Sequence, residues 1–211
     1  MNGQKILKIN KRKFIYLISP NKINKQFYKN LEKVLKSKKI KFFQLRLKKS
    51  STKDLIKIGK KIKPICKKNN VKFIINDNPL ICEKVNADGF HLGQSDISIE
   101  NARLLSKNKL IGITCHNSKR LAKKAKINNA DYIAFGAFFK SKTKYVKYFA
   151  KVELLKWAKK NLKIPIIAIG GINEKNYKEI LKCGANYVAF SSYIWRNKSL
   201  TPIKAISKIN Y

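Results

Sequence analysis

Acidic residues are scarce in this chain of 211 residues. Asp and Glu together number 11 against 49 Lys and Arg, which gives a formal net charge of +38. Long hydrophobic runs are also missing, and none approaches the ~20 apolar residues that a membrane-spanning helix needs. Hydrophobic residues still make up 44% of the chain, which excludes intrinsic disorder despite the charge. The length predicts one large domain rather than two small ones.

Arginine is rare as well, with 5 residues against 44 lysines. A protein that reads DNA sequence relies on arginine for bidentate base contacts, so this composition argues against that class. Lys, Ile, Asn, Phe and Tyr have AT-rich codons, and a low-GC genome is a sufficient cause of their abundance. The alternative cause is a negatively charged partner, which would be nucleic acid, an anionic surface or phosphorylated substrates.

The cysteines of the chain do not have the spacing of a redox or metal-binding motif. Cys66, Cys82, Cys115 and Cys183 form no CxxC pair and no zinc-ligand spacing, so we expect four reduced, mostly buried thiols. The segment 1–11 is polar and basic and has no apolar stretch, so it shows no secretory signal. We therefore expect the protein to stay in the cytoplasm.

Short β-rich runs alternate with longer lysine-rich segments of helical period. Strands are predicted at 14–19, 42–46, 72–75, 89–92, 110–114, 132–135, 166–169 and 187–190. Helices are predicted at 25–38, 52–69, 79–85, 99–106, 118–128, 152–161, 174–183 and 201–209. Several strands are continuous apolar runs, which is typical of strands buried on both faces of a parallel sheet.

The repeated βα unit predicts the fold. The segments 86–89, 129–132 and 183–186 look alike, and each predicts a small-residue turn into the next strand. Eight βα units in about 210 residues predict a single-domain α/β protein, a (β/α)8 TIM barrel. We assign the barrel to 12–211 and a basic N-terminal extension to 1–11. A doubly wound open sheet is the alternative.

Polar side chains follow the predicted strands, where active sites of such barrels lie. Gln44, Arg46 and Lys48 alternate with leucines after the second strand, so we expect them to face the barrel mouth as an anion pocket. Asp77 follows the third strand and Asp96 the fourth, in a chain with only five Asp. Carboxylates from neighbouring strands suit Mg²⁺, whose coordination shell is completed by water and phosphate oxygens.

Hydroxyl groups and glycines follow the later strands. Thr114 ends the fifth strand, and a long loop rich in Lys, Ser and Thr after the sixth fits a lid that grips phosphate. Gly170-Gly171 follows the seventh strand and Ser191-Ser192 the eighth, where barrels often bind phosphate through backbone N–H groups. Two anion sites and one metal site imply two phosphorylated ligands, or one ligand with a diphosphate.

The ordered motifs resemble those of the thiamine phosphate synthase family. The matching strings are Gln44-Leu45-Arg46-x-Lys48, Ile75-Asn76-Asp77, Gly89-Phe90-His91-Leu92-Gly93-Gln94-x-Asp96, His116-Asn117, Ala130-Asp131-Tyr132, Ser141-x-Thr143-Lys144, Ile169-Gly170-Gly171-Ile172 and Ser191-Ser192. The resemblance implies a Mg²⁺-dependent transferase of thiamine biosynthesis. Such an enzyme joins hydroxymethylpyrimidine diphosphate to thiazole phosphate, gives thiamine phosphate and releases pyrophosphate.

The resemblance also implies roles for individual residues. Mg²⁺ would bind Asp77 and Asp96. Arg46, Thr114 and Lys144 would act in catalysis. The pyrimidine diphosphate would be held by Gln44, Arg46, Lys48, Asn76, Thr114 and Lys144. The thiazole phosphate would be held by Ser141, Thr143, Gly171, Ser191 and Ser192. The chain departs from the family pattern at Thr114, where serine is usual, and at Asn78, where arginine or a similar residue is usual.

Two other functions stay open on the sequence. A thiazole tautomerase, an isomerase on the same barrel, would use His116 for proton transfer and would have no need of Arg46, Lys48, Asp77 and Asp96 for a diphosphate. A non-catalytic, basic nucleic-acid-associated protein fits the charge but does not account for the ordered motifs. We therefore expect phosphorylated small molecules as partners, with no specific nucleic acid and no membrane.

Overall fold

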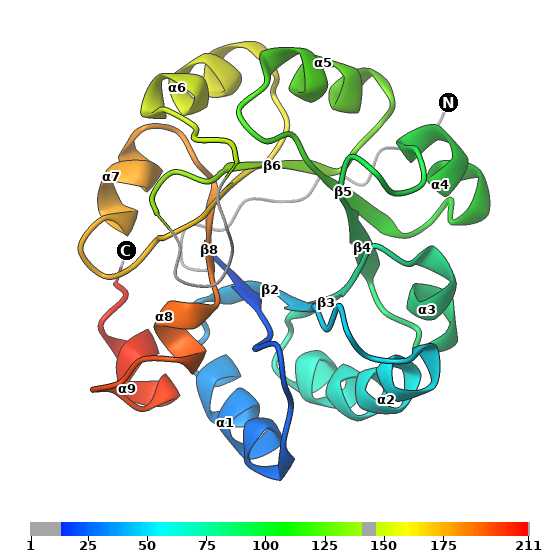
Figure 1. Ribbon diagram of the computed structural model, residues 1–211, viewed down its shortest axis with the longest axis vertical. Helices are drawn as coiled ribbons and strands as arrows, with labels where there is room; N and C mark the ends of the chain where they lie inside the picture. The colour runs from blue at the N-terminus through cyan, green and yellow to red at the C-terminus, as the bar shows by residue number, and fades with distance from the viewer. Residues whose placement is uncertain (1–13, 141–146, 211) are drawn as a thin grey trace.

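A computed structural model describes residues 14–140 and 147–210. Eight parallel strands pair in chain order and close into a barrel, with β8 against β1 (Figure 1). The strands are β1 (Ile15–Ile18), β2 (Ile40–Leu45), β3 (Lys72–Asn76), β4 (Gly89–Leu92), β5 (Leu110–Thr114), β6 (Tyr132–Gly136), β7 (Ile166–Ile169) and β8 (Tyr187–Phe190). The closed barrel confirms the predicted fold and excludes the open sheet. The predicted extension at 1–11 lies outside the described residues.

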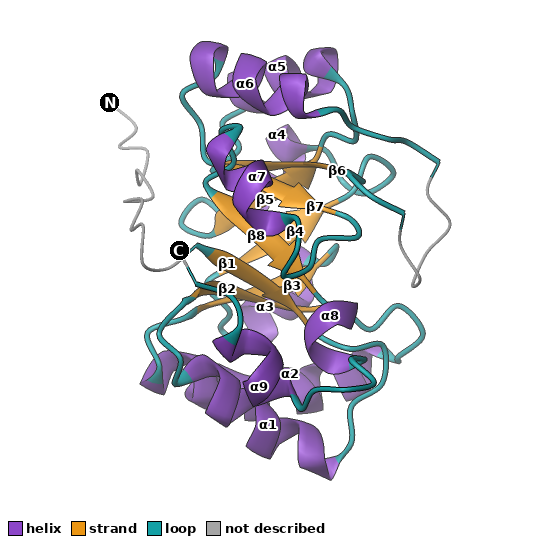
Figure 2. Ribbon diagram, turned by 90° about the vertical axis from the view of Figure 1, so that its left-hand side faces the viewer, coloured by secondary structure: helices purple, strands orange, loops and turns teal. Residues whose placement is uncertain are grey.

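Helices surround the barrel and follow the strands in the chain (Figures 1 and 2). They are α1 (Lys25–Leu35), α2 (Thr52–Lys68), α3 (Pro79–Lys84), α4 (Ile99–Leu105), α5 (Lys119–Ile127), α6 (Val152–Asn161), α7 (Tyr177–Lys182), α8 (Ser192–Trp195) and α9 (Pro202–Ser207). In the described part of the chain, none of them is long and apolar enough to cross a membrane.

The first helix ends at Leu35 rather than at 38, and two further differences from the predicted helices have local reasons. The seventh helix begins at Tyr177 rather than at 174, because Asn173 and Asn176 form a turn in which Asn176 Oδ1 accepts from the Asn173 N–H at 2.9 Å. The short helix α8 was not predicted. The Trp195 indole at its end donates to the Ile18 carbonyl at 2.7 Å and so holds it against the end of β1.

Strand side chains fill two apolar layers. One face of each strand packs under the helices, in a cluster that includes Leu17, Phe43 and Phe73. The other face fills the barrel interior, where Tyr16, Phe42, Ile74, Leu110, Tyr132, Ile167 and Tyr187 form a separate cluster. Because both faces are buried, the strands read as continuous apolar runs in the sequence.

The three look-alike turns carry a shared clamp at the floor of the barrel, where the strands begin. In each turn the residue before an even-numbered strand pairs twice with the preceding strand. Its backbone N–H donates to the carbonyl of one residue in that strand, and its side-chain oxygen accepts from the backbone N–H of the same strand residue. The pairs are Asp88 with Phe73 (2.8 and 3.0 Å), Asp131 with Ile111 (2.8 and 2.7 Å) and Asn186 with Ile166 (2.9 and 2.8 Å).

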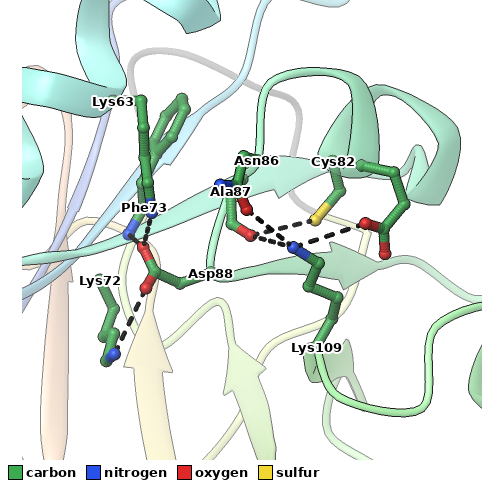
Figure 3. A network of polar contacts seen from close by, with 9 residues as sticks. Lys63, Lys72, Phe73, Cys82, Asn86, Ala87, Asp88 and Lys109 are labelled. Atoms are coloured by element: carbon green, nitrogen blue, oxygen red, sulfur yellow. Dashed lines mark hydrogen bonds and ion pairs between the residues drawn. The ribbon is translucent and has the colours of Figure 1, made fainter.

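Asp88 is also the centre of a charged network (Figure 3). The Lys63 ammonium lies 2.8 Å from one carboxylate oxygen and the Lys72 ammonium 3.3 Å from the other. Burial alone would raise the pKa of Asp88. The hydrogen bonds from Lys63 and the Phe73 N–H, with the charges of both lysines, bring this pKa below its ordinary value.

We predict that Asp88→Asn removes a pH-dependent contribution to the free energy of unfolding. A carboxyl with a lowered pKa stabilises the fold above its unfolded pKa of about 3.9, and this contribution is lost as the pH falls through the folded pKa. At pH 7 the variant should lose about 1–3 kcal/mol of unfolding free energy, because Lys63 and Lys72 lose their counter-ion. Urea unfolding between pH 3 and pH 8 measures this. A gap to wild type that stays constant below about pH 4 would contradict it.

Candidate active site at the barrel mouth

Inward-facing polar groups from four neighbouring strands meet at the carboxyl ends of the strands. Gln44 of β2 is 2% exposed, and its Nε2 donates to Oδ1 of Asn76, the last residue of β3, at 3.0 Å. His91 of β4 places Nε2 2.9 Å from Oγ1 of Thr114, the last residue of β5. The structure thus brings together three residues predicted for the diphosphate, namely Gln44, Asn76 and Thr114.

The two predicted cations of the β2 loop lie beside this group. Lys48 Nζ is 4.0 Å from Asp77 Oδ2. The Arg46 backbone N–H donates to Ser19 Oγ at 2.9 Å, and Ser19, at the end of β1, is 1% exposed. The positive charge of Arg46 lowers the pKa of both Asp77 and His91. These side chains therefore gather at the ends of β2, β3, β4 and β5, where the anion pocket is predicted.

Asp77 and Asp96 face each other across the ends of β3 and β4. Asp77 has a positive φ of 64°, a conformation that Asp tolerates better than most residues, and its N–H donates to the His91 carbonyl at 2.8 Å. Asp96 Oδ2 accepts from the Gly93 N–H at 2.7 Å. Burial, a hydrogen bond with Asp96 and its negative charge raise the pKa of Asp77 to about 6, although Lys48 and Arg46 oppose the change.

This donor set fits Mg²⁺. Two carboxylates that repel each other gain from a cation between them, and Mg²⁺ commonly takes one or two carboxylates and completes its shell with water and phosphate oxygens. Among residues 14–140 and 147–210 there is no cluster of three or more His, Cys, Asp or Glu, so a metal held by protein side chains alone is not built here.

The loops after β6, β7 and β8 form the other side of the mouth. The Phe139 N–H donates to the Gly170 carbonyl at 3.1 Å, and a Cβ on Gly171 would lie 2.5 Å from the Lys140 carbonyl oxygen. Gly171, with a φ of 65°, therefore lets the β6 loop cross close to the β7 loop. Of the lid residues predicted for the phosphates, Ser141, Thr143 and Lys144 lie outside the described residues.

The two predicted serines follow β8. Ser191 Oγ donates to the Ser19 carbonyl at 3.2 Å, and Ser192 is the first residue of α8. Ser19 thus contacts both sides of the mouth, through Arg46 on one side and Ser191 on the other. Ser19 was not predicted as a site residue, because its importance arises only from contacts with residues distant in the sequence.

The structure shows the local contacts of Asn78 and His116, two other residues that the sequence singled out. Asn78, where the family pattern usually has a larger basic residue, is the N-cap of α3, and its Oδ1 accepts from the Ile81 N–H at 2.9 Å. His116 has a φ of 50°, and its ring lies 4.5 Å from the Tyr148 ring. Its neighbour Cys115 is buried, which raises the pKa of the thiol to about 12 and keeps it protonated.

His91 is the main site residue that received no role from the sequence. Burial, and then the charge of Arg46, lower its pKa to about 4, although Asp96 opposes the change, so the imidazole is neutral at pH 7. Its Nδ1 lies 3.3 Å from the Tyr132 hydroxyl. Strand alternation places His91 inward with Gln44 and Asn76, and that pattern is the signal that could have found it.

Comparisons with known proteins agree on one family. A family model described as thiamine monophosphate synthase matches residues 15–194. A thiamine-phosphate synthase of Pelagibacter ubique is 58% identical over 96% of this chain and 98% of its own length. One of Erythrobacter litoralis is 35% identical over 92% and 93%. The solved structure of a thiamine phosphate pyrophosphorylase from Pyrococcus furiosus has a TM-score of 0.82 and 27% identity, and the match covers 94% of both chains.

We predict that Asp77→Asn stabilises the metal-free protein as the pH rises. A carboxyl whose pKa is raised in the fold favours folding below its unfolded value of about 3.9, and this contribution is lost as the pH rises through about 6. The amide does not titrate, so the variant should gain unfolding free energy relative to wild type between pH 4 and pH 7. Chemical denaturation with chelator present measures the gain. A variant less stable than wild type by the same amount at every pH would contradict it.

Proposed function

Because the chain belongs to the thiamine monophosphate synthase family and is a transferase that forms thiamine phosphate, we propose how its barrel mouth divides the two substrates. Hydroxymethylpyrimidine diphosphate binds on the β2–β5 side, and thiazole phosphate binds beside the loops after β6, β7 and β8. The observation that carries this assignment is the juxtaposition of Arg46 and Lys48 with the facing carboxyls of Asp77 and Asp96.

The proposed reaction begins with ionisation of the pyrimidine substrate. The bond between its methylene carbon and the diphosphate oxygen breaks, and the electron pair leaves with pyrophosphate. Arg46, Lys48 and Lys144 stabilise the negative charge that develops on the leaving group, and the Thr114 hydroxyl donates to it. Asp77 and Asp96 hold Mg²⁺, which when bound supplies further positive charge to the diphosphate oxygens.

The second step joins the two substrates. The lone pair of the thiazole nitrogen forms a new bond to the methylene carbon, which gives thiamine phosphate. The protein contributes position rather than a base, since no proton has to be removed. Gln44 and Asn76 hold the pyrimidine substrate at the inner wall. Ser141, Thr143, Gly171, Ser191 and Ser192 hold the thiazole phosphate.

We place this reaction in the cytoplasm. The four cysteines are free, and three of them are buried, which suits a compartment that keeps thiols reduced. The two substrates are phosphorylated small molecules, and the positive charge of the chain raises their rate of encounter with it.

The first test is metal dependence. We expect excess chelator to abolish thiamine phosphate formation and added Mg²⁺ to restore it. Asp77→Asn and Asp96→Asn should each lower kcat/KM by about 10²–10³. Glu179→Gln removes an exposed carboxylate of α7 that has no assigned role and should leave activity unchanged. Wild-type turnover in excess chelator would refute the metal assignment.

A second test separates the synthase from the tautomerase that the sequence left open. We expect Lys144→Ala to lower thiamine phosphate formation by about 10²–10³, because charge stabilisation of the leaving group is lost. His116→Ala should weaken it only moderately. A tautomerase would show the reverse order, with a loss of about 10²–10⁴ on removal of its acid–base histidine. Both variants are compared in assays of synthesis and of isomerisation.

A further inference from the structure

A continuous chain of hydrogen bonds runs from the barrel interior to the mouth. The Tyr16 and Tyr132 hydroxyls are 3.1 Å apart, and the Tyr132 hydroxyl lies 3.3 Å from His91 Nδ1. On the other side of the ring, His91 Nε2 lies 2.9 Å from Thr114 Oγ1. These four side chains come from β1, β6, β4 and β5, so the chain crosses the barrel rather than following one strand.

Packing holds this chain in place. The Tyr132 ring stacks on the His91 ring, with centroids 5.6 Å apart and an interplanar angle of 18°. Gly112 makes room for it, because a Cβ at that position would lie 2.0 Å from a Tyr132 ring carbon. Tyr16 and Tyr132 are each 2% exposed or less. The hydroxyls therefore have little freedom to find partners outside the chain.

The hydrogen bonds among these four side chains have a preferred donor-to-acceptor direction. Each hydroxyl brings one hydrogen, and the neutral imidazole brings one N–H, so one hydrogen is left over at an end. If Thr114 donated to His91, His91 to Tyr132 and Tyr132 to Tyr16, the hydrogen left over would be that of the Tyr16 hydroxyl. That hydroxyl has no second hydrogen-bond partner among residues 14–140 and 147–210. A buried donor without an acceptor is costly. If instead Tyr16 donates to Tyr132, Tyr132 to His91 and His91 to Thr114, the hydrogens of the three buried side chains are all used in hydrogen bonds. The hydrogen left over then belongs to the Thr114 hydroxyl.

We propose that Tyr16, Tyr132 and His91 fix the Nε2–H tautomer of the imidazole and thereby commit the Thr114 hydroxyl to donate into the mouth. His91 and Tyr132 are then positioning residues for an anionic oxygen that Thr114 contacts. This inference rests on the proposed function, which places the diphosphate there. A freely rotating hydroxyl could present a lone pair to an anion, whereas this one presents its hydrogen.

The tautomer can be measured without substrate. The chain has only two histidines, so imidazole ¹⁵N resonances of the intact enzyme are assigned by comparison with His116→Gln. At pH 7 we expect His91 to be neutral with the proton on Nε2. In Tyr132→Phe, Nδ1 loses its donor and Thr114 can donate to Nε2 instead, so the Nδ1–H form should become populated.

Activity is measured on the same proteins with a matched control. Tyr132→Phe should lower kcat/KM for the pyrimidine diphosphate roughly three- to tenfold. Tyr187 is also buried in the barrel interior, and its hydroxyl has no partner among the described residues, so Tyr187→Phe should change kcat/KM by less than about twofold. Thr114→Val should lose roughly 10- to 100-fold, and Thr114→Ser should restore most of the activity.

The outcomes separate this inference from the function on which it rests. An Nδ1–H tautomer in the wild type, or equal kcat/KM values for Tyr132→Phe and Tyr187→Phe, would overturn the positioning role while Thr114→Val still loses activity. Full activity of Thr114→Val would instead overturn the assignment of Thr114 to the diphosphate. The hydrogen bonds through Tyr16, Tyr132 and His91 would then have no role in binding it. The Nε2–H tautomer together with the expected order of activities supports both.

Discussion

Strand register is the constraint on which the site depends. Gln44, Asn76, His91 and Thr114 meet because each occupies an inward position near the end of its strand, and a slip of one residue would turn any of them toward the helices. The floor clamps set this register for three strand pairs. Each fixes one residue of a strand to one residue of the next through two hydrogen bonds. The clamp of Asp88 with Phe73 belongs to the strand pair in which Asn76 of β3 lies beside His91 of β4 at the mouth.

The scarcity of acidic residues makes their placement informative. Asp88 and Asp131 serve the floor clamps, and each is paired with cations, Asp88 with two lysines and Asp131 with Arg103 at 2.7 Å. Asp77 and Asp96 face each other at the mouth. The acids at the floor therefore stabilise the fold, whereas at the mouth burial and the neighbouring Asp96 raise the pKa of Asp77 in the metal-free protein. Such an arrangement is typical of a site that binds a cation with its substrate.

Most of the fold could be predicted because its signals are local. Apolar runs such as residues 166–169, and the turns before β4, β6 and β8, lie within short windows, and they identified every strand. The ordered motifs identified the family for the same reason. Contacts between distant residues could not be predicted. Tyr16 and Tyr132 are 116 positions apart, and nothing in either segment indicates that Gly112 leaves room for their hydroxyls to meet. The helix α8 was missed because it has only 4 residues.

The floor clamps also divide the barrel into units. Each clamp joins an odd-numbered strand to the even-numbered strand that follows it, as Phe73 of β3 is joined to Asp88 before β4. A chain break between α2 and β3, between α4 and β5, or between α6 and β7 leaves all three clamps inside single fragments. A break between β3 and β4 separates the two halves of one clamp. The barrel therefore has preferred break points for circular permutation and fragment complementation, and they lie before β3, β5 and β7.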